Sequence, residues 1–248
     1  MKRQQEVLNK KLIIIIAAVI IAVSGIFGAV MYMLDYYPAV ITDEFSQGSV
    51  GVSIIDYGDG VIAYEAENAK SGIIFYPESK VEYKAYQNLM ASIASRGYVC
   101  LLVEMPLNQP SFGMNEAVAL EMRYPFVTAW YMCGHGSGAR AASAYASRNT
   151  DIFSGVILLG GYPAVDLSST GLKVISVYGS EDKVMNMGGY ERSRSGFPAD
   201  YAELVIEGGC HSYFGSYGMH SGDGTPSVTM TEQLAQTADF IHSNFTYQ

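Results

Sequence analysis

Residues 130–139 of the 248-residue chain read WYMCGHGSGA. An apolar run is followed at once by three glycines that alternate with His135 and Ser137, and an Ala-rich stretch (139–147) comes next. This order is typical of a strand, a tight turn and a helix. A serine hydroxyl on such a turn lies close to the positive end of the helix, which stabilises a developing oxyanion. The stretch therefore predicts a strand–turn–helix unit that carries reactive groups.

Two more candidate residues follow in chain order, each after a short apolar run. Asp182 comes just after residues 174–178, and His211 comes just after residues 204–206. Histidine exchanges a proton near neutral pH, and a carboxylate on its far nitrogen fixes its tautomer. With Ser137 as nucleophile, His211 as general base and Asp182 as the orienting acid, the order is Ser, Asp, His.

The rest of the chain alternates β-rich and helical stretches. Asp59-Gly60 between two β-rich runs indicates a hairpin. The expected strands are residues 50–57, 61–66, 73–76, 98–104, 127–133, 156–159, 174–177 and 204–206. The expected helices are residues 83–96, 118–122, 139–147 and 230–244, the last with a capping box from Thr229 to Glu232. This alternation predicts an α/β fold with a mostly parallel sheet, helices on both faces and antiparallel edge strands from the hairpin.

The amino terminus carries a basic cluster and then a long apolar run. Residues 12–34 hold no charge, and as a helix they extend roughly 35 Å, which is enough to cross a bilayer. Since Lys and Arg favour the cytoplasmic side, we expect a single-pass anchor in the cell membrane with the rest of the chain outside. The alternative is a signal peptide cleaved near Gly28, which would give a secreted protein. The predicted parts are a cytoplasmic tail (1–11), the anchor (12–34), a linker (35–48) and one domain (49–248).

Composition and charge exclude several classes of protein. With 49% apolar and 16% charged residues, the chain is too apolar to be disordered. Beyond Leu34 it holds 11 bases and 23 acids, which excludes a nucleic-acid partner because phosphate binding needs a basic face. Cys100, Cys133 and Cys210 are expected to be small buried hydrophobes that form at most one bridge. The histidines and cysteines lack metal-ligand spacing, so we expect no metal and no cofactor.

From about Val50 to the C-terminal helix, the chain resembles the compact, cap-less α/β-hydrolases, a group often anchored to bacterial membranes. The matching stretches are residues 73–77, 80–83, 103–108, 130–138, 178–182, 207–209 with His211, and 214–218. The resemblance implies an α/β-hydrolase fold and a serine hydrolase with Asp182 and His211 as triad partners. Its substrate would be a small molecule with a carboxyl ester or a related acyl bond.

The chain departs from the family pattern at two places. The family reads Gly-His-Ser-x-Gly-Gly, whereas here Gly136 stands in the nucleophile column and Ser137 follows one place later, before Gly138. The family turn after the third strand reads Tyr-Pro-Gly-Gly and supplies a backbone N–H to the oxyanion hole. Here Glu78 and Ser79 stand in that turn, and a carboxylate pointing inward would repel the developing negative charge.

Three interpretations of the turn remain open. In the first, the turn shifts by one residue and Ser137 is the nucleophile. In the second, the turn keeps its register, and the nucleophile position holds Gly136, which tolerates a positive φ but has no hydroxyl. In the third, Asp182 and His211 activate a water directly. Loss of the hydroxyl favours a second function, an inactive pseudo-hydrolase that serves as a binding module.

An apolar acyl pocket is expected near the carboxyl ends of the strands, formed by Tyr76, Tyr83, Met105, Phe214 and Tyr217.

Overall fold

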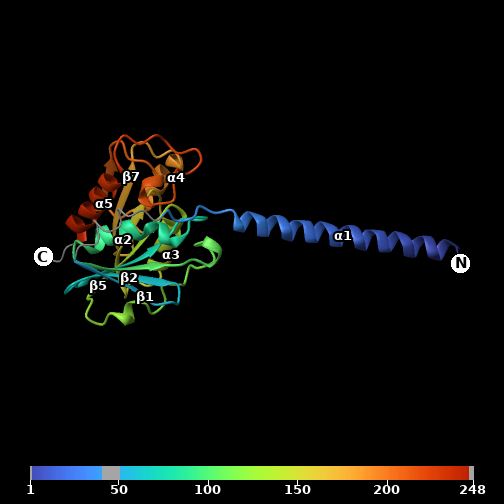
Figure 1. Ribbon diagram of the computed structural model, residues 1–248, viewed down its shortest axis with the longest axis horizontal. Helices are drawn as coiled ribbons and strands as arrows, with labels where there is room; N and C mark the ends of the chain where they lie inside the picture. Colours follow the sequence, from blue (N-terminus) through green and yellow to red (C-terminus); the bar gives the residue numbers. More distant parts are fainter. Residues whose placement is uncertain (1, 41–50, 246–248) are drawn as a thin grey trace. The chain divides into compact units, whose positions relative to one another are not determined.

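The computed structural model describes residues 2–40 and 51–245, and the chain divides into two units, Met1–Tyr36 and Tyr37–Gln248. The first unit contains one helix, α1 (Lys2–Leu34) (Figure 1). Its Asn9–Tyr32 segment has a mean hydropathy of 2.9 and is long and apolar enough to cross a membrane. A signal sequence near the N-terminus passes the same test of length and composition, so both interpretations of the amino terminus remain.

The second unit is built on an eight-stranded sheet in the order β1-β2-β4-β3-β5-β6-β7-β8. The β1–β2 and β2–β4 pairs are antiparallel and all the others are parallel, which confirms the predicted mostly parallel α/β sheet. The strands are β1 (Val52–Asp56), β2 (Val61–Ala66), β3 (Ser71–Tyr76), β4 (Tyr98–Val103), β5 (Ala129–His135), β6 (Phe153–Leu159), β7 (Lys173–Gly179) and β8 (Ala202–Ile206).

Helices cover both faces of this sheet. Alternate strand residues enter two hydrophobic clusters, so that Leu101 and Met132 lie on one face and Cys100 and Tyr131 on the other. Side chains of α2 and α5 complete the second cluster, and those of α3 and α4 complete the first. The helices are α2 (Gln87–Ala94), α3 (Ser137–Ala146), α4 (Met187–Ser193) and α5 (Met230–Phe245). Short 3₁₀ turns are Tyr83–Tyr86, Pro106–Asn108, Glu121–Arg123, Arg194–Gly196 and Ser212–Phe214.

Two helix predictions differ from the structure. The expected helix 118–122 is wrong: this segment consists of turns, with only the 3₁₀ turn Glu121–Arg123. Ala119 has a positive φ of 61°, which interrupts a right-handed helix, and Val118 and Met122 are exposed, so packing gives a helix here no support. Helix α4 was missed because its two glycines lower helix propensity, although Asn186 caps it by accepting a hydrogen bond from the Gly189 N–H.

Several local predictions are confirmed. The capping box of α5 forms: Thr229 N–H donates to Glu232 Oε2 at 2.7 Å, and Glu232 N–H donates to Thr229 Oγ1 at 3.2 Å. The three cysteines are free and buried, as small hydrophobes are.

Part of the predicted linker 35–48 lies in the second unit, where the Tyr37 N–H donates to the Lys80 carbonyl at 2.7 Å. Residues 41–48 lie outside the described residues.

Candidate active site

The site lies where parallel strands end. Because β3, β5, β7 and β8 run in one direction, their carboxyl ends meet at the same edge of the sheet. Glu78 follows β3, Gly136 follows β5, Asp182 follows β7 and His211 follows β8. The topology therefore brings together four segments that lie far apart in the sequence.

The turn between β5 and α3 keeps its register, so Gly136 is the strained residue. Its φ of 51° and ψ of −113° lie in a region that side-chain-bearing residues rarely adopt. Gly138 is required for a different reason: a Cβ there would lie 2.2 Å from the carbonyl oxygens of Tyr76 and Pro77. Ser137 is the first residue of α3. The nucleophile position of the turn thus carries no side chain.

The structure places Ser137 against the turn after β3. Its Oγ accepts a hydrogen bond from the Ser79 N–H at 2.7 Å and donates to the Ser79 Oγ at 2.8 Å. Both contacts of the hydroxyl lead to Ser79, whereas the Nε2 of His211 is bound to Glu78. The three residues predicted as a catalytic set are therefore not joined in one hydrogen-bonded chain: Asp182 and His211 are, and Ser137 is not.

Asp182 and His211 form a buried pair, as their order and positions after strands predicted. His211 Nδ1 lies 2.9 Å from Asp182 Oδ2, and both side chains are almost fully shielded from solvent. Asp182 Oδ1 accepts hydrogen bonds from the N–H groups of Val184 and Met185, at 2.9 and 2.8 Å. The carboxylate is thus held in a fixed orientation, and it orients the imidazole in turn.

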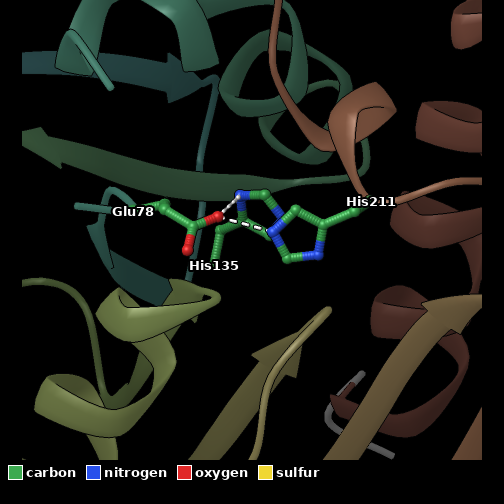
Figure 2. A group of neighbouring side chains, drawn as sticks. All are labelled: Glu78, His135 and His211. Atoms are coloured by element: carbon green, nitrogen blue, oxygen red, sulfur yellow. Dashed lines mark hydrogen bonds and ion pairs between the residues drawn. The ribbon is translucent and has the colours of Figure 1, made fainter. Parts of the chain in front are cut away.

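Glu78 points inward and fills the place of the missing nucleophile. Its Oε2 lies 2.5 Å from His211 Nε2, and its side chain is only 13% exposed (Figure 2). A Cβ built on Gly136 would lie 2.4 Å from Glu78 Oε1, closer than real atoms approach. The two departures from the family pattern are therefore one structural change, in which a carboxylate from one turn occupies the space left by the side chain of another.

His135 completes the cluster. It is fully buried, its Nδ1 lies 2.9 Å from the Tyr86 hydroxyl and 3.6 Å from Glu78 Oε2, and its ring centroid is 4.2 Å from that of His211 (Figure 2). Glu78, His135 and His211 are also the kinds of side chain that hold a metal ion, and one ligand atom of each lies within 4.8 Å of the others.

The charges of this cluster follow from its contacts. Burial alone disfavours the imidazolium of His211, but hydrogen bonds to Asp182 and Glu78 outweigh it and raise the pKa of His211 to about 10. Burial also opposes the ionisation of Glu78, but the hydrogen bond from His211 lowers the pKa of Glu78 to about 2. Burial, together with the charge of His211, lowers the pKa of His135 to about 3. At neutral pH the site therefore holds ionised Glu78, cationic His211 and neutral His135.

Backbone donors of the turn after β3 are occupied by side chains. The Ser79 N–H donates to Ser137 Oγ, and the Glu78 N–H donates to the Tyr86 hydroxyl at 3.3 Å. These are the N–H groups of the turn that was expected to supply the oxyanion hole. In this arrangement they satisfy the protein's own oxygens instead of a bound substrate oxygen.

The residues predicted to form an acyl pocket do not share one cluster. Tyr76 and Met105 belong to the hydrophobic cluster on one face of the sheet, and Tyr83, Phe214 and Tyr217 belong to the cluster on the other. The Tyr76 hydroxyl donates to the Met114 carbonyl and accepts from the Ala117 N–H, so it stabilises the backbone of that loop. The ring of Phe214 lies 5.2 Å from that of His135 and contacts the site directly.

Sequence reasoning missed three contributors to the site. The first is His135, which contacts the other site residues, and the second is Tyr86, whose hydroxyl lies against His135 Nδ1. The third is Asp223, whose Oδ2 accepts hydrogen bonds from the N–H and hydroxyl of Ser212 beside His211. A signal for the Glu78–His211 contact was present in the sequence. The sequence has an extra carboxylate in one turn, at Glu78, and lacks a side chain in another, at Gly136. The structure brings these two positions together.

The comparisons with known proteins agree with this fold. A family profile described as "Alpha/beta hydrolase family" matches residues 72–235, about two thirds of the chain. Among solved structures, a predicted CIB-like hydrolase from Thermoplasma acidophilum is 14% identical with a TM-score of 0.56, covering 77% of this chain and 97% of that one. TT1662 from Thermus thermophilus is 16% identical with a TM-score of 0.56 and coverages of 79% and 99%. Est1E from Butyrivibrio proteoclasticus is 17% identical with a TM-score of 0.52 and coverages of 78% and 98%. No curated protein matches the sequence.

Proposed function

This chain belongs to the alpha/beta hydrolase family, and we propose that it is a membrane-tethered, extracytoplasmic member that has lost serine-type ester hydrolysis and acts as a binding module. One observation carries the proposal. The Glu78 carboxylate occupies the place of the nucleophile side chain and is bound to His211, 2.5 Å from its Nε2.

The nucleophile, the general base and the oxyanion donors that acyl transfer needs are all altered in ways that oppose the reaction. A nucleophile must reach the general base, but Gly136 has no side chain and Ser137 is bound to Ser79. The base must accept a proton, but with its pKa raised to about 10 His211 already carries one at neutral pH. The oxyanion needs free donors, but the Ser79 N–H is used by Ser137. All three support a site that does not hydrolyse esters.

Fluorophosphonate labelling tests the loss of serine chemistry. The intact chain in detergent micelles is expected to remain unlabelled and to leave p-nitrophenyl esters intact, because the Ser137 hydroxyl is bound to Ser79 and His211 Nε2 is bound to Glu78. A labelled, active serine hydrolase of the same fold serves as the control for reagent and detergent. Labelling of the native chain that is retained in Ser137→Ala would contradict the proposal, because another residue of the chain would then be the reactive nucleophile.

Ester hydrolysis through Ser137 is a second candidate, supported by the buried Asp182–His211 pair beside the turn. It requires Ser137 to leave Ser79 and Glu78 to withdraw from His211. Labelling that is present in the native chain and absent in Ser137→Ala would establish it. Ester turnover without any labelling would instead point to a water activated by Asp182 and His211, at the reduced rate expected without a nucleophile.

The membrane tether is supported by α1 and the charges before it. Its apolar segment Asn9–Tyr32 has the length of a membrane span, and the bases Lys2, Arg3, Lys10 and Lys11 precede the uncharged run. A fusion of alkaline phosphatase to the C-terminus is therefore expected to be active and to stay with the membrane after an alkaline carbonate wash. Activity released into the medium would indicate cleavage, and an inactive fusion would place the domain inside the cell.

A further inference from the structure

We propose that Glu78, His135 and His211 form a binding site for one divalent transition-metal ion, with Zn²⁺ as the expected occupant. The inference rests on the proposed binding function and names a ligand class for it. Three different segments supply the donors: the turn after β3, the end of β5 and the loop after β8 (Figure 2). One ligand atom of each residue lies within 4.8 Å of the others.

The spacing of the donors is close to what a tetrahedral ion needs. Bonds of about 2.0–2.2 Å to imidazole and carboxylate place neighbouring ligand atoms about 3.4 Å apart in a tetrahedron. Glu78 Oε2 and His135 Nδ1 are already 3.6 Å apart. Glu78 Oε2 and His211 Nε2 are 2.5 Å apart, so they must separate by about 1 Å when the shared proton is replaced by the ion. Gly136 presents no side chain to block that movement of the carboxylate.

The support behind His211 is the kind that orients a metal ligand. Its Nδ1 lies 2.9 Å from Asp182 Oδ2, which leaves Nε2 facing Glu78. Asp182 is itself held by two backbone N–H groups. Histidines that bind metals commonly donate their other ring N–H to a carboxylate, which fixes the tautomer and strengthens the ligand.

His135 supplies the third donor through Nδ1, the ring nitrogen that lies 3.6 Å from Glu78 Oε2. Its imidazole is fully buried, and Nδ1 now lies 2.9 Å from the Tyr86 hydroxyl, which must release it when the ion binds. A neutral buried imidazole is a standard ligand for Zn²⁺, and two imidazoles with one carboxylate are a donor set that suits it.

Binding exchanges one proton for the ion. The proton shared by His211 Nε2 and Glu78 Oε2 leaves to solvent, and the ion takes its place between imidazole and carboxylate. At the same time His135 Nδ1 exchanges its hydrogen bond with the Tyr86 hydroxyl for a bond to the ion.

Zinc titration of the intact chain tests the site. The protein in detergent micelles, freed of metal with a chelator and dialysed, is titrated with ZnCl₂ against a chromogenic chelator. We expect one Zn²⁺ per chain, and at least about tenfold weaker binding in Glu78→Gln and in His135→Asn. His242→Ala, which alters a histidine on α5 outside the donor cluster, should bind like the native chain.

A second readout separates coordination from nonspecific binding. Co²⁺ in place of Zn²⁺ is expected to give the visible absorption bands of a tetrahedral site in the native chain, and to lose them in Glu78→Gln. Circular dichroism checks that the variants fold. The proposal is overturned if the folded native chain binds less than about one tenth of an equivalent, or if Glu78→Gln binds as tightly as the native chain. Neither result changes the fluorophosphonate outcome, so the two proposals fail separately.

Discussion

The double variant Glu78→Gly, Gly136→Ser is expected to become a serine hydrolase that reacts with a fluorophosphonate. The first change removes the carboxylate that lies 2.4 Å from a Cβ at position 136 and frees His211 Nε2. The second puts a hydroxyl on the strained turn residue, next to the oriented Asp182–His211 pair. With one carboxylate gone, the pKa of His211 should fall toward the range of a working base.

We expect at least a hundredfold gain in labelling rate over the native chain. This is well below the roughly 10⁶-fold that a serine contributes in an optimised protease, because Ser137 still occupies the Ser79 N–H. The measurement is the labelling rate, with mass spectrometry to locate the adduct at position 136. A serine at a φ of 51° also costs about 1 kcal/mol or more, so a lower free energy of unfolding is expected.

The two single variants are the matched controls. Gly136→Ser alone should stay unreactive because the new Cβ meets the Glu78 carboxylate, and Glu78→Gly alone should stay unreactive because it adds no hydroxyl. Adding Ser137→Ala to the double variant should leave labelling in place. A double variant that folds but does not label would show that the two positions are not alternatives for the same space.

The free energy of unfolding is expected to decrease as the pH rises from 7 to 10 in the presence of EDTA. Contacts with Asp182 and Glu78 raise the pKa of His211 from an ordinary value near 6.5 to about 10. A raised pKa stabilises the folded chain fully below about 6.5, and this stabilisation is lost as the pH passes through about 10. At about 1.4 kcal/mol per pKa unit, the change is on the order of a few kcal/mol. With its pKa near 2, Glu78 stays ionised over this whole range.

Denaturant unfolding of the full chain in micelles, followed by circular dichroism, measures this change. In Glu78→Gln the free energy of unfolding should decrease less between pH 7 and 10, because only Asp182 then stabilises the imidazolium of His211. Glu181→Gln, which alters an exposed glutamate paired loosely with Lys183 at 3.7 Å, should leave it unchanged. A native chain with equal stability at pH 7 and pH 10 would show that Glu78 does not stabilise a charged His211.

Most of the fold was determined by local sequence. Apolar runs of strand length, separated by helical stretches, predicted a mostly parallel sheet, because buried parallel strands need apolar residues on both faces. The placement of Asp182 and His211 after two of those strands also followed, since the carboxyl ends of parallel strands share one edge. The expected helix at 118–122 failed where Ala119 takes a positive φ, which the residue type does not reveal.

The sequence alone determined which reactive groups the chain carries, that the turn after residues 130–135 holds Gly136 in the family's nucleophile position, and that a membrane-length apolar run precedes the domain. Tertiary structure alone decided that Glu78 turns inward, that Ser137 bonds to Ser79, and that His135 joins the cluster. The physical reason is distance along the chain. Backbone patterns are local, whereas the direction of the Glu78 side chain depends on space left vacant at Gly136 and on a charge at His211, 58 and 133 residues away.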